Sequence, residues 1–353
     1  MGDIMDVIER KKFGEIDLSD TFFDTLRNDY PGFDDWFNKK AIGNEDAYIL
    51  DECGIQGFLY LKEETGCDDT VEPRLEYDRK LKVGTFKINA HGTKLGERFI
   101  KIVIDEMYKE KYQVVYVTIF DHHSSLINLL TTYGFIHYGV KNSRAGIEQV
   151  FIKYADNSIG NIYFDFPRVN IEGNKKLMLA IYPEYHTRMF PNSKLKTERE
   201  HIVEDTPYTN SIEKVYLSAI NLSQYKKGDV IVIYRTADEG KKAEYSSVAT
   251  SVCTIIEVKY INDFVSYEIF LQYCLKNSVF TETELEMFWK TKRYKYVVKM
   301  LYNIALKKRI TRHDLIEAVG LDRGQRWSVV ALSDLEFNNI LELGEVDESF
   351  IID

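Results

Sequence analysis

The stretch from Lys82 to Met107 constrains the fold of this 353-residue chain more than any other. Residues 82–89 alternate between polar and β-branched or aromatic side chains, which is typical of a β-strand. Residues 90–96 hold two glycines, and from Leu95 onward apolar residues recur at the spacing of one helix face. A strand, a glycine-bearing loop and a helix in this order point backbone N–H groups and a positive helix end at the loop. The stretch predicts an anion site, with phosphate the usual guest; an ordinary strand-to-helix turn is the alternative.

The first half of the chain combines helices and strands in an order that predicts an α+β fold with a mixed sheet. Besides 82–89, the expected strands are residues 47–50, 55–61, 114–120, 135–140 and 149–154, and helices are expected within residues 4–40, 95–107 and 124–133. Residues 155–160 are rich in turn formers, so we expect them to end a domain covering residues 1–155.

The second half predicts a different domain, covering residues 161–353. Its expected strands are residues 177–182, 228–234, 246–258, 294–306 and 327–332, and its expected helices are 263–275, 281–289 and 312–319. Well-spaced β-branched runs with small helices between them favour a compact, barrel-like β domain.

With these elements in place, the first half resembles the GNAT superfamily of acetyl-CoA-dependent N-acetyltransferases. The resemblance rests on the element order, on the loop His91-Gly92-Thr93-Lys94-Leu95-Gly96, and on Gly134-Phe135 after the helix that follows the buried strand. The family's loop signature is Arg/Gln-x-x-Gly-x-Gly/Ala. Gly96 matches its last position, whereas His91 stands for Arg or Gln and Lys94 for the first Gly.

The resemblance implies a GNAT-like mixed sheet flanked by helices, with acetyl-CoA as co-substrate and an amine as acceptor. By the same resemblance, the strand and loop would bind the cofactor through Phe86, Lys87, Ile88, His91, Gly92, Thr93, Lys94, Leu95, Gly96 and Glu97. The family often has a tyrosine as general acid four residues before the glycine that corresponds to Gly134. This chain has Leu130 at that position.

Three residues are candidates for acid or base catalysis, namely His123, His122 and Tyr133. Histidine titrates near neutral pH, so either ring could take a proton from an amine substrate. Each histidine could instead be a helix cap or a surface residue, and Tyr133 could be a packing residue. Many members of the family need no dedicated base, because the amine can lose its proton through water.

Charge and cysteine content limit the partners and the compartment. The net charge of -10 arises in residues 1–80, which carry 21 Asp and Glu against 10 Lys and Arg, a net of -11, while the remaining residues carry a net of +1. This acidity could attract a cationic amine, or it could be a solvated acidic face.

The four cysteines form no C-x-x-C pair and no His/Cys cluster at zinc spacing, so we expect free thiols, no metal and a cytoplasmic location. No run of eighteen apolar residues predicts a membrane span.

The second half resembles the PUA-like group that includes ASCH and EVE domains, through Leu217-Ser218-Ala219 and residues 225–235 with their Lys-Gly-Asp turn. The resemblance implies a PUA-like β-barrel with small helices and an RNA or tRNA partner, with Tyr208, Thr209 and Asn210 lining a cleft. Residues 290–312 hold nine Lys and Arg, no Asp or Glu, and interleaved aromatics. Such residues can attract phosphates and stack on bases, or the aromatics can face the core while the lysines face water.

Together these patterns predict a two-domain N-acetyltransferase that moves acetyl from acetyl-CoA to a primary amine, on an RNA-linked, protein or small-molecule substrate. The alternative is a catalytically inactive module that binds acyl-CoA or RNA. The oligomeric state stays open.

Overall fold

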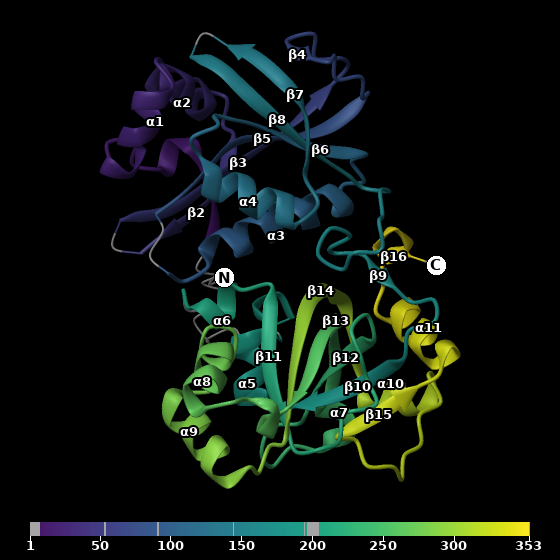
Figure 1. Ribbon diagram of the computed structural model, residues 1–353. Coiled ribbons are helices and arrows are strands. Elements are labelled where there is room, and N and C mark those ends of the chain that lie inside the picture. Colours follow the sequence, from purple (N-terminus) through teal and green to yellow (C-terminus); the bar gives the residue numbers. More distant parts are fainter. Residues whose placement is uncertain are drawn as a thin grey trace. The chain divides into compact units, whose positions relative to one another are not determined.

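The computed structural model describes residues 8–52, 54–89, 92–143, 145–193, 195 and 205–352. The chain divides into two compact units, Met1–Phe164 and Asp165–Asp353, called unit 1 and unit 2 below. Each unit combines a mixed β-sheet with helices, so the expected α+β class is confirmed (Figure 1). Within the described part of the chain, no helix has both the length and the apolar character needed to cross a lipid bilayer.

Unit 1 is built on an eight-stranded sheet with the order β1-β2-β3-β5-β6-β8-β7-β4. β5 and β6 are parallel, and the other neighbouring pairs are antiparallel. The strands are β1 (Ile8–Lys12), β2 (Asp46–Asp51), β3 (Ile55–Thr65), β4 (Val71–Glu72), β5 (Arg79–Ile88), β6 (Val114–Ile119), β7 (Ile136–Ser143) and β8 (Gly146–Tyr154). The helices are α1 (Asp24–Asp29), α2 (Phe33–Ile42), α3 (Leu95–Lys109) and α4 (Ser124–Thr132).

Helices cover both faces of this sheet. Phe58 of β3 belongs to an aromatic core with Phe23, the residue before α1, and Phe37 of α2. Phe86 of β5 points to the opposite face, where its ring centroid lies 5.9 Å from that of Phe99 in α3. Figure 1 shows α4 beside α3, and the two helices are in contact. Apolar burial on both faces fixes the register of the central strands.

The expectation of helix within residues 4–40 is wrong for residues 8–12, which form β1. This segment pairs with β2, so that Ile8 lies opposite Leu50 and Lys12 opposite Asp46. A charged segment has little apolar periodicity of its own, and the open edge of β2 offers its backbone hydrogen-bond partners. Tertiary pairing therefore decides the structure here, while α1 and α2 form within the expected helical range.

Unit 2 contains a six-stranded mixed sheet with the order β11-β14-β13-β12-β10-β15 and a two-stranded sheet of β9 and β16. The strands are β9 (Val169–Asn170), β10 (Lys176–Ile181), β11 (Glu213–Ser218), β12 (Val230–Arg235), β13 (Val248–Tyr260), β14 (Tyr296–Thr311), β15 (Val329–Leu332) and β16 (Ile351–Ile352). The helices are α5 (Pro183–Met189), α6 (Pro207–Asn210), α7 (Ala243–Ser246), α8 (Tyr267–Leu275), α9 (Glu282–Thr291), α10 (Arg312–Glu317) and α11 (Asp334–Leu343). Among the described residues no pairing joins β11 to β15, so this sheet stays open at both edges and the expected β-barrel is not closed.

The Lys-Gly-Asp turn before β12 is held by a buried carboxylate. Asp229 accepts a hydrogen bond of 2.9 Å from the backbone N–H of Lys175 and one of 2.8 Å from the backbone N–H of Lys226. Gly228 adopts a φ of 94°, which favours glycine. The turn therefore has a structural role, because Asp229 ties β12 to the start of β10.

Candidate active site

The parallel strands β5 and β6 are paired at one end and diverge at the other. Their pairing joins Leu81–Val83 of β5 to Val115–Val117 of β6, and no later pair joins them among the described residues. A register shift between Tyr60 and Leu61 of β3 leaves Gly84 of β5 as a bulge. A Cβ atom on Gly84 would lie 2.6 Å from the Tyr60 ring, so glycine is required where the strands separate.

The diverging strands border a cavity of about 940 Å³. It is lined by the second half of β5, the end of β6, the first turns of α4, and residues of α1, α2 and the turn between them. Lys62, Glu64 and Lys82 give it a charged end, with the Lys82 ammonium 3.6 Å from the Glu64 carboxylate. A cavity of this size with a few converging polar groups is typical of a small-molecule site.

Phe86, Lys87 and Ile88, three residues predicted to bind the cofactor, line this cavity from the diverging half of β5. Their backbone pairs with β3 on one side, whereas β6 has left the other side. A strand edge of this kind can hydrogen-bond an extended ligand as if the ligand were another strand. The Lys87 side chain donates to the carbonyl of Phe22 and the hydroxyl of Thr25, and burial lowers the pKa of Lys87.

The predicted phosphate loop is described from Gly92 onward, and His91 lies outside the described residues. Gly92 has a φ of 88°, and Lys94, the residue before α3, has a φ of 58°. The Lys94 ammonium lies 3.1 Å from the carboxylate of Glu97 in the first helical turn. Among the described residues that line the cavity, none belongs to the 92–97 segment.

Gly96 is a close-packing position at the start of α3. A Cβ atom there would lie 3.0 Å from a methyl group of Leu129 and 3.2 Å from a methyl group of Ile88. The missing side chain lets α3 approach both α4 and the end of β5. Gly96, the last residue of the loop, thus lies directly beside the cavity-lining residue Ile88.

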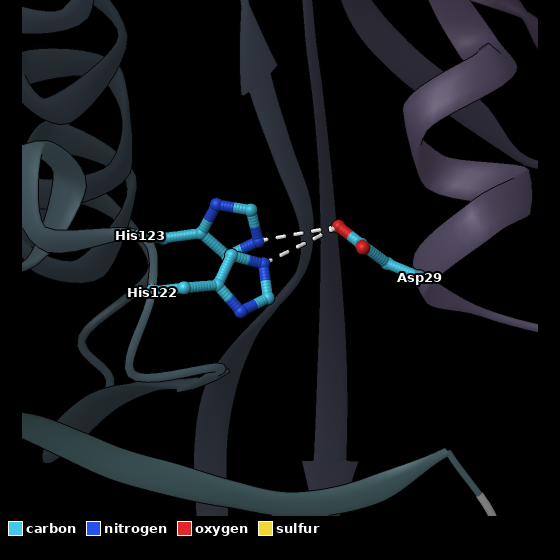
Figure 2. Close-up of side chains that lie close together, drawn as sticks. All are labelled: Asp29, His122 and His123. Atoms are coloured by element: carbon cyan, nitrogen blue, oxygen red, sulfur yellow. Dashed lines mark ion pairs between the residues drawn. The ribbon is translucent and has the colours of Figure 1, made fainter.

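His122 and His123 lie at the junction of β6 and α4 and line the cavity beside Asp29 (Figure 2). The distance to the Asp29 Oδ2 atom is 3.4 Å from Nε2 of His123 and 3.8 Å from Nε2 of His122. Burial and the neighbouring His122 lower the pKa of His123, while Asp29 acts in the opposite direction. The ring of His123 is therefore mainly neutral near pH 7, the state that accepts a proton.

Tyr133, the third predicted catalytic residue, lies away from this cavity lining. Its side chain is buried, and its hydroxyl lies 3.5 Å from the Glu97 carboxylate. Leu130, at the position of the family's tyrosine, is fully buried and occupies the core. Among the described residues, the structure therefore brings the histidine pair to the cavity and places Tyr133 elsewhere.

Comparisons with known proteins give distant structural neighbours. The sequence matches no protein-family profile and no curated protein. An ASCH protein from Zymomonas mobilis is 13% identical, with a TM-score of 0.31 over 48% of this chain and 95% of its own. An IAA acetyltransferase from Bacillus cereus is 12% identical, with a TM-score of 0.32 over 42% of this chain and 97% of its own. A GNAT family acetyltransferase from Elizabethkingia anophelis, solved with acetyl-CoA bound, is 12% identical, with a TM-score of 0.30 over 42% and 99%.

Asp29, Tyr30 and Glu148 are among the cavity-lining residues that no sequence pattern singled out. The Tyr30 hydroxyl donates a 3.2 Å hydrogen bond to the carboxylate of Glu148, which is 5% exposed. Burial, followed by the charge of Glu148, raises the pKa of Tyr30. Glu148 is 118 residues away from Tyr30, so no local spacing could have joined them.

Part of the positive charge of residues 290–312 is paired with carboxylates within unit 2. Lys290 pairs with Glu286 at 2.6 Å, and Lys299 pairs with Glu213 at 2.6 Å. The Lys292 ammonium lies 3.0 Å from the centroid of the Trp289 ring. The predicted cleft residues Tyr208, Thr209 and Asn210 belong to α6, and Thr209 and Asn210 are buried. RNA contact through this unit stays a prediction.

Proposed function

We propose that unit 1 is an N-acyltransferase that moves acetyl from acetyl-CoA to a primary amine. The observation that carries this proposal is the divergence of β5 from β6 beyond Val83, beside the 940 Å³ cavity. Among the described residues, the divergence leaves a strand edge without a neighbouring strand, next to the glycine-bearing loop and the start of a 15-residue helix.

The strand edge and the loop suit the two ends of an acyl-CoA. The pantetheine arm carries two amides and can lie along Phe86–Ile88, with main-chain hydrogen bonds in place of those of a strand. The pyrophosphate then meets the loop of residues 91–96 and the N–H groups at the start of α3. Lys94 is paired with Glu97, so the backbone supplies most of the phosphate contacts in this proposal.

The cavity would hold the thioester and the acceptor amine. The amine nitrogen attacks the thioester carbonyl, the C–N bond forms, the C–S bond breaks, and CoA leaves as a thiolate that takes a proton from water. His123 or His122 accepts the proton that the amine loses. The carboxylates of Asp29, Glu64 and Glu148 line the same cavity and attract a cationic amine before it loses this proton.

Filling the cavity tests the proposal. Thr118 of β6 lines the cavity, so Thr118→Trp should abolish the saturable calorimetric binding of acetyl-CoA that the unaltered full chain shows. The matched control is Thr131→Trp, because Thr131 is exposed on α4 and lies outside the lining. The absence of acetyl-CoA binding to the unaltered chain, or equal binding by Thr118→Trp and Thr131→Trp, would overturn the proposed cofactor site.

Turnover separates an enzyme from an inactive binding module. The chain should release CoA from acetyl-CoA when it is offered amines from three classes: polyamines, lysine peptides and aminoacyl-tRNA. The acylated amine should be found by mass spectrometry, and the Thr118→Trp variant should not form it. Binding without any acylated product across the three classes would favour the inactive acyl-CoA-binding alternative.

A further inference from the structure

Three side chains at the cavity turn one atom each toward a common point (Figure 2). Asp29 comes from the end of α1, and His122 and His123 come from the junction of β6 and α4. One carboxylate oxygen and one ring nitrogen from each histidine all lie within 4.8 Å of one another. All three residues belong to unit 1 and line the same cavity.

The distances between these atoms are long for direct hydrogen bonds. An N–H···O hydrogen bond spans about 2.7–3.2 Å, whereas the Nε2–Oδ2 distances are 3.4 Å for His123 and 3.8 Å for His122. Bonds of about 2.0–2.1 Å to a tetrahedral zinc ion place its ligand atoms about 3.3–3.4 Å apart. The His123–Asp29 distance of 3.4 Å matches this spacing, and the His122–Asp29 distance of 3.8 Å exceeds it by about 0.4 Å.

We propose that Asp29, His122 and His123 form a binding site for a zinc-type divalent cation. Two imidazole nitrogens and one carboxylate oxygen suit Zn²⁺ or Co²⁺, whereas Mg²⁺ and Ca²⁺ prefer oxygen ligands alone. Three protein ligands leave a fourth position for water or for a ligand in the cavity. The inference is independent of the proposed acyl transfer, because ion binding needs only these three side chains.

Aromatic rings flank the proposed ligands. The His122 ring stacks on Phe120 at an interplanar angle of 12° and a centroid distance of 5.7 Å. Phe120 in turn packs on Tyr30, the neighbour of Asp29, at 5.3 Å. His123 occupies the N-cap position of α4 but makes no side-chain capping bond, so the helix does not compete for its ring. An apolar shell of this kind limits the access of solvent to a metal site.

Cobalt and zinc titrations of the full chain test the site directly. After chelator treatment and desalting, one equivalent of Co²⁺ should produce the visible absorption bands of tetrahedral coordination, and Zn²⁺ should displace it. Asp29→Asn, His122→Ala and His123→Ala should each weaken Zn²⁺ binding by at least about 10-fold, the least that losing even an outer partner usually costs. Competition with a chromogenic chelator measures the affinity.

Matched controls separate this site from other metal-binding groups. His137→Ala removes an exposed histidine of β7, Asp35→Asn removes an exposed carboxylate of α2, and Cys67→Ser removes an exposed thiol. These variants should bind Zn²⁺ like the unaltered chain. The proposal is overturned if Co²⁺ gives no tetrahedral bands, or if the three ligand variants keep full affinity. The Co²⁺ spectrum needs no variant, so misfolding of a variant cannot hide the answer.

Discussion

The Lys94 ammonium lies 3.1 Å from the Glu97 carboxylate, while the Lys94 backbone adopts a left-handed φ of 58°. A Cβ atom is disfavoured in this conformation, so glycine is the residue that position 94 would accommodate best. The same geometry gives the Lys94 side chain a partner on α3. Lys94 is thus a strained loop residue with a paired charge.

Replacing Lys94 tests the cost of this backbone conformation. Lys94→Gly and Lys94→Ala both remove the ammonium, but only glycine relieves the left-handed strain. The glycine variant should be roughly 0.5–1 kcal/mol more stable than the alanine variant. Urea unfolding of the full chain gives the comparison.

The control pair is Lys109→Gly and Lys109→Ala at the last residue of α3, where the backbone is helical. There the order should reverse, because glycine is the poorer helix former. The same order of stability at both positions would contradict the strain assigned to Lys94.

Gly134 should tolerate no side chain. Its φ is 85°, and an added Cβ would collide with the carbonyl of Phe164 and lie 2.6 Å from the ammonium of Lys153. These two groups share a 2.8 Å hydrogen bond. Gly134→Ala should therefore cost roughly 2–5 kcal/mol from backbone strain and overpacking together.

The matched control for that change is Gly160→Ala. Gly160 also has a positive φ, of 74°, but a Cβ there would meet no described atom within 4 Å. Gly160→Ala should lower the free energy of unfolding by about 1 kcal/mol, from backbone strain alone. Calorimetric melting of the full chain measures both variants, and equal losses would refute the collision at Gly134.

Local pattern was enough to predict most elements, because their apolar residues repeat at the period of the element they form. The strand at residues 82–89 and the helix from Leu95 correspond to β5 and α3, and the β-branched run of residues 246–258 corresponds to β13. β1 was not predictable in this way. Its charged residues form a strand only because β2 offers an edge at which Ile8 meets Leu50.

The cavity shows the same limit at the level of side chains. The sequence drew attention to His122 and His123 but not to Asp29, which is far away in the chain and reaches the pair only through the packing of α1. The expectation of no metal rested on ligand spacing along the sequence and stays untested. A cluster assembled from two distant segments leaves no such spacing to detect.

The buried His186 predicts a dependence of stability on pH. The ring is fully buried in unit 2, and burial, then Arg235 and Arg309, lower the pKa of His186 to about 3. In the unfolded chain a histidine has a pKa of about 6.5. Between these values the unfolded state binds the extra proton, so stability falls as pH falls, by about 2 kcal/mol between pH 7 and pH 5.

Variants isolate this contribution. His186→Gln removes the titrating group and keeps an atom that can bond the Thr250 hydroxyl, which lies 2.8 Å from the ring nitrogen. The loss of stability between pH 7 and pH 5 should shrink in this variant. His137→Gln changes an exposed histidine and should keep the wild-type dependence. Urea unfolding midpoints at pH 7, 6 and 5 measure this dependence of stability on pH. A His186→Gln variant with the same pH dependence as the unaltered chain would contradict the role assigned to His186.

The two proposals for the cavity together predict inhibition by zinc. A bound ion occupies the nitrogen lone pairs that His122 and His123 would use to accept a proton, so Zn²⁺ should suppress acylation of the amine. Because Zn²⁺ also binds free thiols, acylated product should be counted by mass spectrometry rather than released CoA. The Zn²⁺ concentration that halves each protein's own uninhibited rate should rise at least about 10-fold in Asp29→Asn. The same concentration should be unchanged in Asp35→Asn. Equal sensitivity of the two variants would mean that the inhibiting ion binds elsewhere.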